Sequence, residues 1–457
     1  MRRIAIVGGG YLGSVTALLF SQNPDYQITL IEKSDRLGGL YNDAWEDGPY
    51  HFDFGSRAIL ATGMEEIDDN LFSLLPEAEY RKSTANLKEF SFQSGTLCEY
   101  SNCLDARLLP KDIYAKGLAE LMSVSPEHFD GQVFANLAEF SVAHYGQTLT
   151  DHLIRPAMEK LTGLPLEAQD PVSLPTHALH RLIMVGGGEA KKLKAENPFN
   201  DARIAFTRFD DHASKLTKAY PRTEGLSRFS QRLHQGLLAR SNVRVLTNTS
   251  VEAIVRTDTR FNTLTLDNGE SLSCDEVLWT IPSIFLAKLI GTDLSGLKPT
   301  TFRNTVLAHY LIKGEIKTSG YFVYNYDQGF KTYRATFYDN FTQRPEPYKS
   351  VTIEMFHDAL DPDLEGLRTS LFDELKAMGC IDQNAVIAKS DVQFHRNGWP
   401  NFSTDFFSGQ AALNERVKGH YENLHFLGKA NGRHHTLALI HSAYELFRQF
   451  NPVPVSA

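Results

Sequence analysis

The spacing of apolar positions changes along the first 32 residues. Residues 4–7 form a short β-branched run that ends at a glycine, which is typical of a buried parallel strand. From Leu12 to Leu19, apolar residues recur at helical spacing. A second apolar run covers residues 27–31 and ends at Glu32. The pattern therefore predicts a strand, a helix and a second strand in immediate succession.

Later segments continue in the same way. Strands are predicted at residues 243–246, 251–255, 276–281 and 424–427. An Asp267-Asn268-Gly269 sequence predicts a hairpin turn. A helix with one apolar face, which includes Leu437, is predicted after the last strand.

The rest of the chain predicts a second lobe. Residues 138–165 are expected to be largely helical, with Leu149, Leu153 and Met158 as core candidates. Residues 302–386 alternate apolar and polar positions, as strands of a sheet do. The polar residues 191–201 are expected to form an exposed loop.

Composition narrows the class of protein. The chain has 457 residues, 42% of them hydrophobic, and a formal net charge of −9, which suits a globular protein and gives no reason to expect a nucleic-acid partner. No apolar run reaches the ~18 residues of a membrane span. Four widely spaced cysteines indicate reduced thiols. The first strand follows Met1 almost directly and leaves no room for a signal peptide, so we expect a cytoplasmic protein.

Gly8, Gly10 and Gly13 form a G-x-G-x-x-G motif between the first strand and the helix. In a dinucleotide-binding unit the first glycine permits a tight turn, and the second lets the backbone approach a pyrophosphate. The third allows close packing of helix and strand. The helix N-terminus, with Tyr11 and Leu12, would direct its N–H groups at the phosphates.

Glu32 lies 19 residues beyond Gly13, where a carboxylate can accept hydrogen bonds from both ribose hydroxyls. A 2′-phosphate at this place would face like-charge repulsion, which disfavours NADP. We extend the predicted nucleotide site to the adjacent Lys33.

Two glycine-containing segments follow the second strand. The first contains Arg36, Gly38 and Gly39, and the second contains Gly55, Ser56 and Arg57. This pattern resembles the flavoprotein superfamily that contains amine oxidases, protoporphyrinogen oxidase and UDP-galactopyranose mutase. The resemblance implies that the R-x-G-G segment wraps the FAD pyrophosphate and that the second loop passes the isoalloxazine ring. It therefore implies FAD as the cofactor, in preference to NAD.

Later segments extend the resemblance. Residues 220–238 resemble the superfamily's P-x-G-G-M-x-x-L helix start, although residues 223–225 depart from the double glycine. Val251 matches a position that contacts the adenine end of FAD. Gly428 and the helix of Leu437 match the last element of the FAD domain. Lys429 stands where the oxidases usually have an acidic residue and the mutases have an arginine.

These observations predict an α/β protein of two domains. The first is a Rossmann-like FAD-binding domain in three layers, with a mostly parallel sheet and a small antiparallel sheet. It is expected at residues 1–75, 205–298 and 388–457. The second is a mixed α+β substrate-binding domain, expected at residues 76–204 and 299–387.

Three residues are candidates for contact with the reacting groups. Arg334 resembles the strand arginine that mutases point toward a diphosphate or carboxylate, and a structural ion pair or a contact with an aromatic ring is its alternative. Arg57 is expected beside the flavin ring, in a loop where the mutases carry a histidine. His435, next to His434, either contacts flavin or substrate or begins the last helix with local hydrogen bonds. No metal site is predicted, because His434 and His441 have no carboxylate or cysteine partner close in sequence.

The resemblance implies an FAD-dependent oxidoreductase acting on a small molecule, either an amine or a sugar or nucleotide sugar. The sharper hypothesis is a sugar-modifying enzyme. The alternative is a UDP-galactopyranose mutase-like isomerase without net redox change, which Lys429 and Arg334 favour. A flavin-binding protein without enzymatic activity is a third class. The oligomeric state is left open, with a homodimer among the options.

Overall fold

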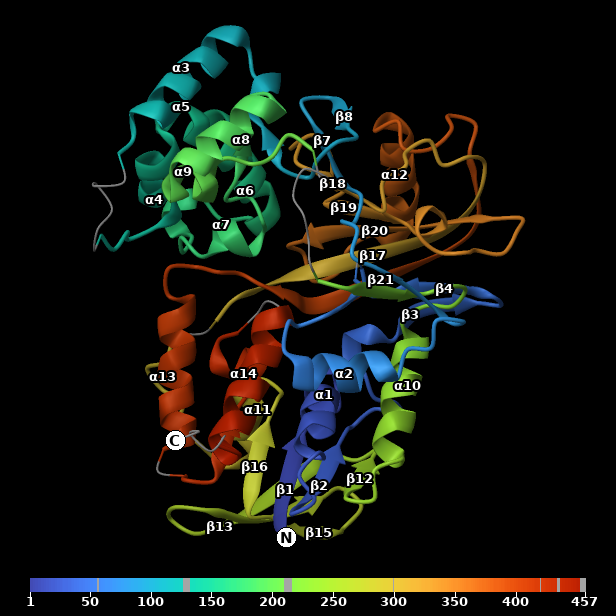
Figure 1. The fold of residues 1–457 in the computed structure, drawn as a ribbon, viewed down its shortest axis with the longest axis vertical. Helices are drawn as coiled ribbons and strands as arrows, with labels where there is room; N and C mark the ends of the chain where they lie inside the picture. Colours follow the sequence, from blue (N-terminus) through green and yellow to red (C-terminus); the bar gives the residue numbers. More distant parts are fainter. Residues whose placement is uncertain are drawn as a thin grey trace. The chain divides into compact units, whose positions relative to one another are not determined.

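The computed structural model describes residues 1–55, 57–125, 132–208, 216–298, 300–419, 421–433 and 436–452 (Figure 1). They form two compact units, each assembled from separate stretches of the chain. Unit 1 comprises Met1–Ser83, Leu216–Lys298 and Phe407–Ala457. Unit 2 comprises Thr84–Lys215 and Pro299–Phe406.

Unit 1 is built on a five-stranded sheet in which all neighbouring strands are parallel. In spatial order its strands are β12 (Val243–Leu246), β2 (Tyr26–Ile31), β1 (Arg2–Val7), β16 (Glu276–Trp279) and β22 (Leu424–Phe426). Each begins and ends within two residues of the strand that the sequence predicts. The β-branched and apolar composition of these short runs suits a sheet that is covered on both faces.

Three helices pack on one face of this sheet (Figure 1). They are α1 (Tyr11–Phe20), α10 (Ser227–Leu238) and α14 (Thr436–Phe450). All 10 residues of α1 are buried, because the helix contacts both α10 and α14. Ring contacts of Tyr11 with Phe229 and of Phe20 with Phe447 join the three helices.

The opposite face carries a small antiparallel sheet. It consists of β13 (Val251–Arg256), β14 (Phe261–Leu266) and β15 (Ser271–Ser273). Ala5, Val7 and Trp279 of the parallel sheet share a buried core with Phe261 and Leu264. The helices α11 (Ser283–Leu289) and α13 (Phe406–Lys418) add residues to the same core. The predicted three-layer Rossmann-like fold is confirmed.

Further short elements complete unit 1. The strands β3 (Asp43–Asp47) and β4 (Tyr50–Asp53) pair as a hairpin. A three-stranded sheet contains β5 (Ile59–Leu60), β11 (Lys218–Pro221) and β6 (Tyr80–Ser83). The helix α2 (Glu65–Ser73) contacts α1.

Unit 2 contains a seven-stranded mixed sheet. Its order is β21 (Val386–Pro400), β17 (Phe302–Lys313), β20 (Lys349–His357), β19 (Arg334–Phe337), β18 (Phe322–Asn325), β7 (Glu89–Gln93) and β8 (Thr96–Cys98). One face packs its apolar residues, such as Val306 and Ile353, against the helix α12 (Leu364–Ala377). Because side chains alternate along a strand, the neighbouring residues, such as His309 and Thr352, face the other side.

The rest of unit 2 is mainly helical. Its helices are α3 (Lys111–Ser123), α4 (Leu137–Tyr145), α5 (Gln147–Leu149), α6 (Arg155–Thr162), α7 (Ser173–Thr176), α8 (Gly187–Glu196) and α9 (Pro198–Arg203), with a π-helical turn at Thr150–Ile154 and the short parallel pair β9 (Leu104–Asp105) and β10 (Leu182–Ile183). Leu149, Leu153 and Met158 lie in its core, as the sequence predicts.

One predicted loop and three of the predicted domain boundaries differ from the structure. Residues 76–83, expected in the substrate-binding domain, lie in unit 1, and residues 205–208, expected in the FAD-binding domain, lie in unit 2. The prediction of an exposed loop at residues 191–201 is wrong, because α8 and α9 cover most of this segment. The Lys194 ammonium is buried there and donates a hydrogen bond of 2.7 Å to the Ile204 carbonyl. Residues 388–406, which we expected in the FAD-binding domain, contain most of β21, and β21 pairs with β17 in the sheet of unit 2.

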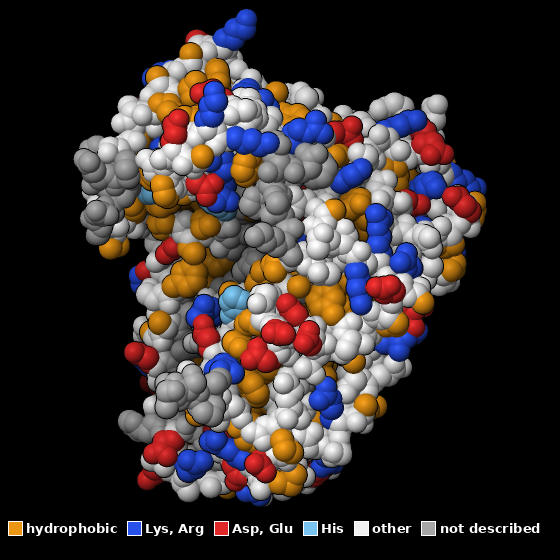
Figure 2. All heavy atoms as spheres, viewed as in Figure 1, with side chains coloured by type: hydrophobic (Ala, Val, Ile, Leu, Met, Phe, Trp, Pro, Cys, Tyr) orange, Lys and Arg blue, Asp and Glu red, His pale blue; other side chains and the backbone are white. Residues whose placement is uncertain are grey.

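The surface charges and the cysteines say little more about the function. No helix in the described part of the chain is long and apolar enough to cross a membrane. Figure 2 shows Lys and Arg side chains intermingled with Asp and Glu over the visible face. The four cysteines are free thiols.

Candidate functional site

The glycine loop follows β1 directly and combines tight packing with one open position. A Cβ added at Gly13 would clash with the carbonyl oxygen of Gly8. Gly8 itself has a φ of +104°, and a Cβ there would lie 2.5 Å from Thr280 Oγ1. At Gly10, by contrast, an added Cβ would meet no atom of the described chain within 4 Å. The backbone at Gly10 therefore faces open space at the N-terminus of α1, where an anion is favoured.

Two predicted segments meet this loop. The Glu32 carboxylate accepts hydrogen bonds from the N–H groups of Gly9, at 2.7 Å, and Ser34, at 2.8 Å. Gly38 N–H donates to the Gly9 carbonyl at 2.8 Å, and Gly10 and Gly38 form a parallel β-bridge. The structure thus places Glu32 and the R-x-G-G segment directly on the glycine loop, as a dinucleotide site requires.

A pocket of about 650 Å³ opens beside the loop. Its walls come from the carboxyl ends of β1, β2 and β16 and from the start of β13, and include Gly8, Glu32, Lys33, Val251 and Trp279. Val251, expected at the adenine end, and Glu32, expected at the ribose, therefore line one cavity. Pockets at the carboxyl ends of parallel strands are the usual ligand sites of such sheets.

The remaining residues of the R-x-G-G segment and the α1 start lie nearby. The exposed Arg36 pairs with Asp35, with Nε 3.2 Å from Oδ1. A Cβ at Gly39 would lie 3.3 Å from the Cα of Gly10. The Tyr11 ring packs against Tyr41, with a centroid distance of 4.4 Å.

The C-terminal element reaches the same region. A Cβ at Gly428 would clash with the Leu12 side chain, so the turn after β22 lies against the start of α1. Gly428 N–H donates to Ser442 Oγ of α14 at 3.1 Å, and the half-buried Leu437 lies one turn before it on that helix. Lys429 follows in a short 3₁₀ turn, Gly428–Asn431.

Lys429 and Arg57 form the positively charged part of the site. The protein atoms packed around the Lys429 ammonium partly desolvate it and lower its pKa, although the residue as a whole is exposed. The positive charge of Arg57 lowers this pKa further. Arg57 Nε donates to the Phe54 carbonyl at 3.2 Å, and Gly55 N–H donates to the Asp53 carbonyl at 2.8 Å. Ser56, His434 and His435 lie outside the described residues.

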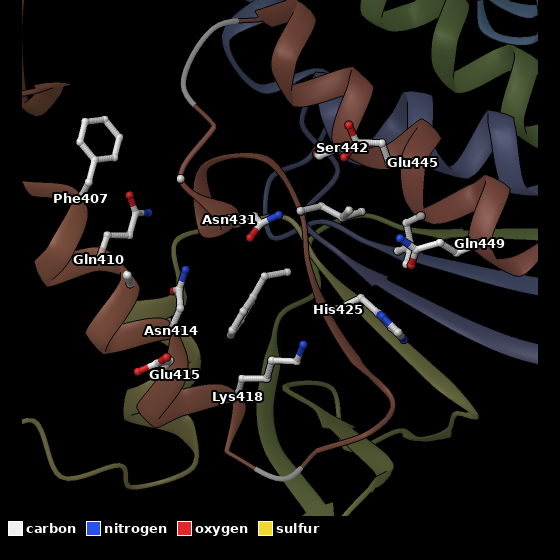
Figure 3. A pocket seen from close by; sticks show the side chains of 15 residues that line it. Phe407, Gln410, Asn414, Glu415, Lys418, His425, Asn431, Ser442, Glu445 and Gln449 are labelled. Atoms are coloured by element: carbon white, nitrogen blue, oxygen red, sulfur yellow. The ribbon is translucent and has the colours of Figure 1, made fainter. Parts of the chain in front are cut away.

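A second pocket, of about 600 Å³, lies between α13 and α14 over β22 (Figure 3). The side-chain amides of Gln410 and Asn414 donate to the carbonyls of Lys429 and Ala430 there, so α13 supports the turn that carries Lys429. This pocket contains neither the glycine loop nor Glu32. The residues expected to hold the nucleotide, such as Gly8, Glu32 and Val251, line the first pocket instead.

Three potential metal ligands, Asp43, Glu46 and His51, lie within 4.8 Å of one another. The Asp43 carboxylate is 2.7 Å from His51 Nδ1 and accepts hydrogen bonds from the N–H, at 3.1 Å, and the hydroxyl of Ser227. These bonds fasten the β3–β4 hairpin to the start of α10. We assign the cluster a structural role.

Arg334 makes a buried ion pair in unit 2. Its Nε and Nη2 each lie 2.7 Å from a Glu354 carboxylate oxygen, and its guanidinium lies between the rings of Tyr324 and Tyr333. Burial opposes the charge, but the Glu354 carboxylate outweighs it and keeps the pKa of Arg334 well above its usual value. This is the arrangement that we weighed as the alternative to substrate binding.

Thr280 is absent from the predicted site. Its hydroxyl donates to the carbonyls of Val7, at 2.9 Å, and Gly8, at 3.1 Å, and so fixes the glycine loop. Its place near the end of the predicted strand at residues 276–281 is a signal that could have identified it, because parallel strands present their carboxyl ends at one edge.

The site residues fit FAD. The open cradle at Gly10 suits a pyrophosphate, and the Glu32 carboxylate has lone pairs left for ribose hydroxyls after its two backbone bonds. Lys429 and Arg57 add positive charge for an anionic dinucleotide.

Comparisons with known proteins point to the same fold. Reduced UDP-galactopyranose mutase matches with a TM-score of 0.73 at 15% identity, over 99% of this chain and 96% of that chain. A putative protoporphyrinogen oxidase from Exiguobacterium sp. 255-15 matches with a TM-score of 0.69 at 18% identity, over 98% of both chains. A redesigned putrescine oxidase matches with a TM-score of 0.60 at 12% identity, again over 98% of both. Identities this low show a shared fold alone.

A search of curated sequences finds no match. The family model of the flavin containing amine oxidoreductases, however, matches residues 15–445, which is most of the chain. The chain thus belongs to the flavin-containing amine oxidoreductase family, and its cofactor is FAD.

Proposed function

We propose that the protein is an FAD-dependent oxidoreductase that acts on a sugar or a nucleotide sugar. The observation that carries the proposal is a row of hydrogen-bonding side chains across four adjacent strands of unit 2. Thr336, Thr352, His309 and Asp391 are successive register partners on β19, β20, β17 and β21. They lie on the sheet face opposite the α12 core.

This polar row suits a hydroxylated substrate better than an aliphatic amine. A hydrocarbon chain favours apolar walls, whereas a sugar offers donors and acceptors at each hydroxyl. The Thr336 hydroxyl is buried and has no hydrogen-bond partner within the described residues. A buried hydroxyl of this kind gains a hydrogen bond from a substrate hydroxyl. It stays unpaired with a substrate that lacks one, so the site discriminates against such a substrate.

The proposed roles in unit 1 concern the cofactor. FAD supplies the two-electron redox chemistry when it is bound. The backbone at Gly10 and the α1 N-terminus hold the pyrophosphate, Glu32 accepts the ribose hydroxyls, and Val251 contacts the adenine. Arg57 and Lys429 place positive charge at the flavin end, and His435, which the sequence suggests as a contact to flavin or substrate, lies outside the described residues.

A UDP-galactopyranose mutase-like isomerase is the second candidate. The likeness to reduced UDP-galactopyranose mutase over 99% of this chain supports it, and so does the cationic Lys429 after Gly428. The loop at Arg57, which lacks the histidine of the mutases, favours the oxidoreductase instead.

Anaerobic spectroscopy separates the two candidates. The holoenzyme is mixed with UDP-galactose, with free galactose and, as a control, with putrescine, and flavin absorbance near 450 nm is followed. Loss of absorbance with either sugar, accompanied by an oxidised sugar product, supports the oxidoreductase. Loss with putrescine alone contradicts a sugar substrate.

The same mixture then receives dithionite. Conversion of UDP-galactose only in the reduced enzyme, with no electron acceptor consumed, contradicts the oxidoreductase and supports the mutase-like candidate. No conversion of either sugar in either redox state contradicts both candidates.

A further inference from the structure

Arg344 in unit 2 is a half-buried residue whose guanidinium nitrogens are buried and form no ion pair within the described residues. It lies in the loop between β19 and β20, and its guanidinium stacks on Tyr338 at 4.5 Å from the ring centroid. Its Nε, Nη1 and Nη2 are all inaccessible to solvent, and none has a hydrogen-bond partner in the part of the chain that the structure describes. A guanidinium carries five N–H donors, so this is a large unmet demand for acceptors.

The acidic residues nearest in sequence are occupied elsewhere. Asp339 Oδ2 accepts hydrogen bonds from the N–H of Ser350, at 2.8 Å, and from its hydroxyl, at 3.0 Å. Glu346 is largely exposed and pairs with Lys349 at 3.0 Å. Neither carboxylate therefore compensates Arg344. Arg334 differs in this respect, because Glu354 neutralises it through two hydrogen bonds.

A buried charge without a counter-ion is costly, because the group has lost its hydration and contact with an aromatic ring replaces only part of it. Such a cost is usually retained where a ligand completes the arrangement. An anion would satisfy both the charge and the donors, and the planar fork of a guanidinium matches the paired oxygens of a phosphate or a carboxylate.

The stacked tyrosine connects Arg344 to the polar row. Tyr338 Oη lies 3.0 Å from Thr352 Oγ1, and Thr352 Oγ1 lies 2.8 Å from His309 Nδ1. Burial lowers the pKa of His309 to about 3, so the imidazole is neutral and adds no positive charge. Arg344 supplies the charge next to a set of neutral hydrogen-bonding groups.

We propose that Arg344 binds an anionic oxygen group of the substrate, while three members of the polar row, Thr336, Thr352 and His309, bind its hydroxyls. The proposal rests on the proposed sugar substrate and narrows it to an anionic one. Two sources offer the required oxygens, namely the diphosphate of a nucleotide sugar and the carboxylate of an acidic sugar.

Calorimetric titration of FAD-saturated protein tests this assignment without turnover. The probes are UDP against uridine, and galacturonate against galactose, so that each pair differs mainly in its anionic group. The variant is Arg344→Gln. Its matched control is Arg368→Gln, which removes a partly exposed arginine of α12, on the other face of the sheet, that pairs with Glu365.

We expect UDP or galacturonate to bind the unaltered protein, and Arg344→Gln to weaken that binding by about 30-fold or more. Arg368→Gln should leave it unchanged, and Arg344→Lys, which keeps the charge and loses the fork, should fall between. Whichever probe responds identifies the source. Failure of both anions to bind, or equal binding to Arg344→Gln, overturns the proposal.

Thermal denaturation of the holoenzyme, with and without the anion, provides an independent test. Because Arg344→Gln removes an uncompensated buried charge, it should leave the Tm of the anion-free protein unchanged or raise it. It should also abolish the rise in Tm that the anion produces. A clear fall in Tm would mean that Arg344 has a structural partner, which overturns the proposal. Anion binding through Arg344 without sugar turnover would contradict the proposed function alone.

Discussion

Gly10→Ala separates cofactor binding from folding more cleanly than any other single change in the glycine loop. Gly10 is the N-cap of α1 and has an extended conformation, with φ −61° and ψ −178°, which alanine adopts freely. Its added Cβ would meet no described atom within 4 Å. Replacing glycine by alanine at an N-cap should therefore cost less than about 1 kcal/mol of folding stability.

The same methyl group should weaken FAD binding strongly. It would occupy the space through which the backbone approaches the pyrophosphate. Forcing one extra methyl group into a packed contact costs about 1–3 kcal/mol. That cost corresponds to a rise of roughly 5- to 150-fold in the Kd for FAD.

Gly186→Ala is the matched control. Gly186 is also an N-cap, of α8, with φ −64° and ψ 159°, and its added Cβ likewise meets no described atom within 4 Å. Gly13→Ala is the opposite case, because its Cβ would clash with the Gly8 carbonyl and should destabilise the fold itself.

Each variant is stripped of FAD, its Tm is measured, and FAD is titrated by quenching of flavin fluorescence. We expect Gly10→Ala to keep Tm and lose affinity, Gly186→Ala to keep both, and Gly13→Ala to lose Tm. Unaltered affinity in Gly10→Ala would refute the placement of the pyrophosphate. Equal loss of affinity in Gly186→Ala would refute the specificity of the effect.

Three further predictions concern charged groups. Burial lowers the pKa of Lys160 from 10.5 to about 8, so between these pH values the unfolded chain binds more protons than the folded one, and the free energy of unfolding should rise with pH by about 3 kcal/mol. Lys160→Met should lack this rise, and an equal pH dependence of its unfolding would disprove the prediction. Arg334→Met should cost about 3–5 kcal/mol by stranding the buried Glu354, and Arg334→Met with Glu354→Leu should recover most of it in thermal denaturation; a double variant no more stable than the single one would count against an isolated pair. Lys429→Met should raise the Tm of FAD-free protein, because it removes a charge that desolvation and the Arg57 charge both disfavour, and it should lower FAD affinity; a lower Tm with full affinity would contradict this.

Unit 1 was predictable because its signals are local. The strand at residues 243–246 appears in the structure with the same bounds, and the other strands of the parallel sheet differ by two residues at most. The glycine loop and Glu32 lie within one strand–helix–strand unit, so their spacing alone brings them together.

Unit 2 depends on contacts that a pattern along the chain does not contain. Most residues of 191–201 are exposed or half-buried, as their polarity suggests, but they lie on helices α8 and α9, and the Lys194 ammonium is buried on the Ile204 carbonyl. Strand β21 belongs to the sheet of unit 2 because it pairs with β17, which ends more than 70 residues earlier. Pairing over such a distance leaves no local signal.

The two arginines of unit 2 show the same limit at the level of a site. Arg334 attracted attention because aromatic residues flank it, but its partner Glu354 sits 20 residues away on the neighbouring strand. Arg344 stands between a glutamine and a proline, as many exposed loop arginines do, and only the folded chain leaves its guanidinium buried and without an acceptor among the described residues. Whether a charge serves stability or binding depends on which groups already neutralise it. Because neutralisation is a tertiary property, the arginine that looks unremarkable in the sequence is the better candidate for holding an anionic substrate.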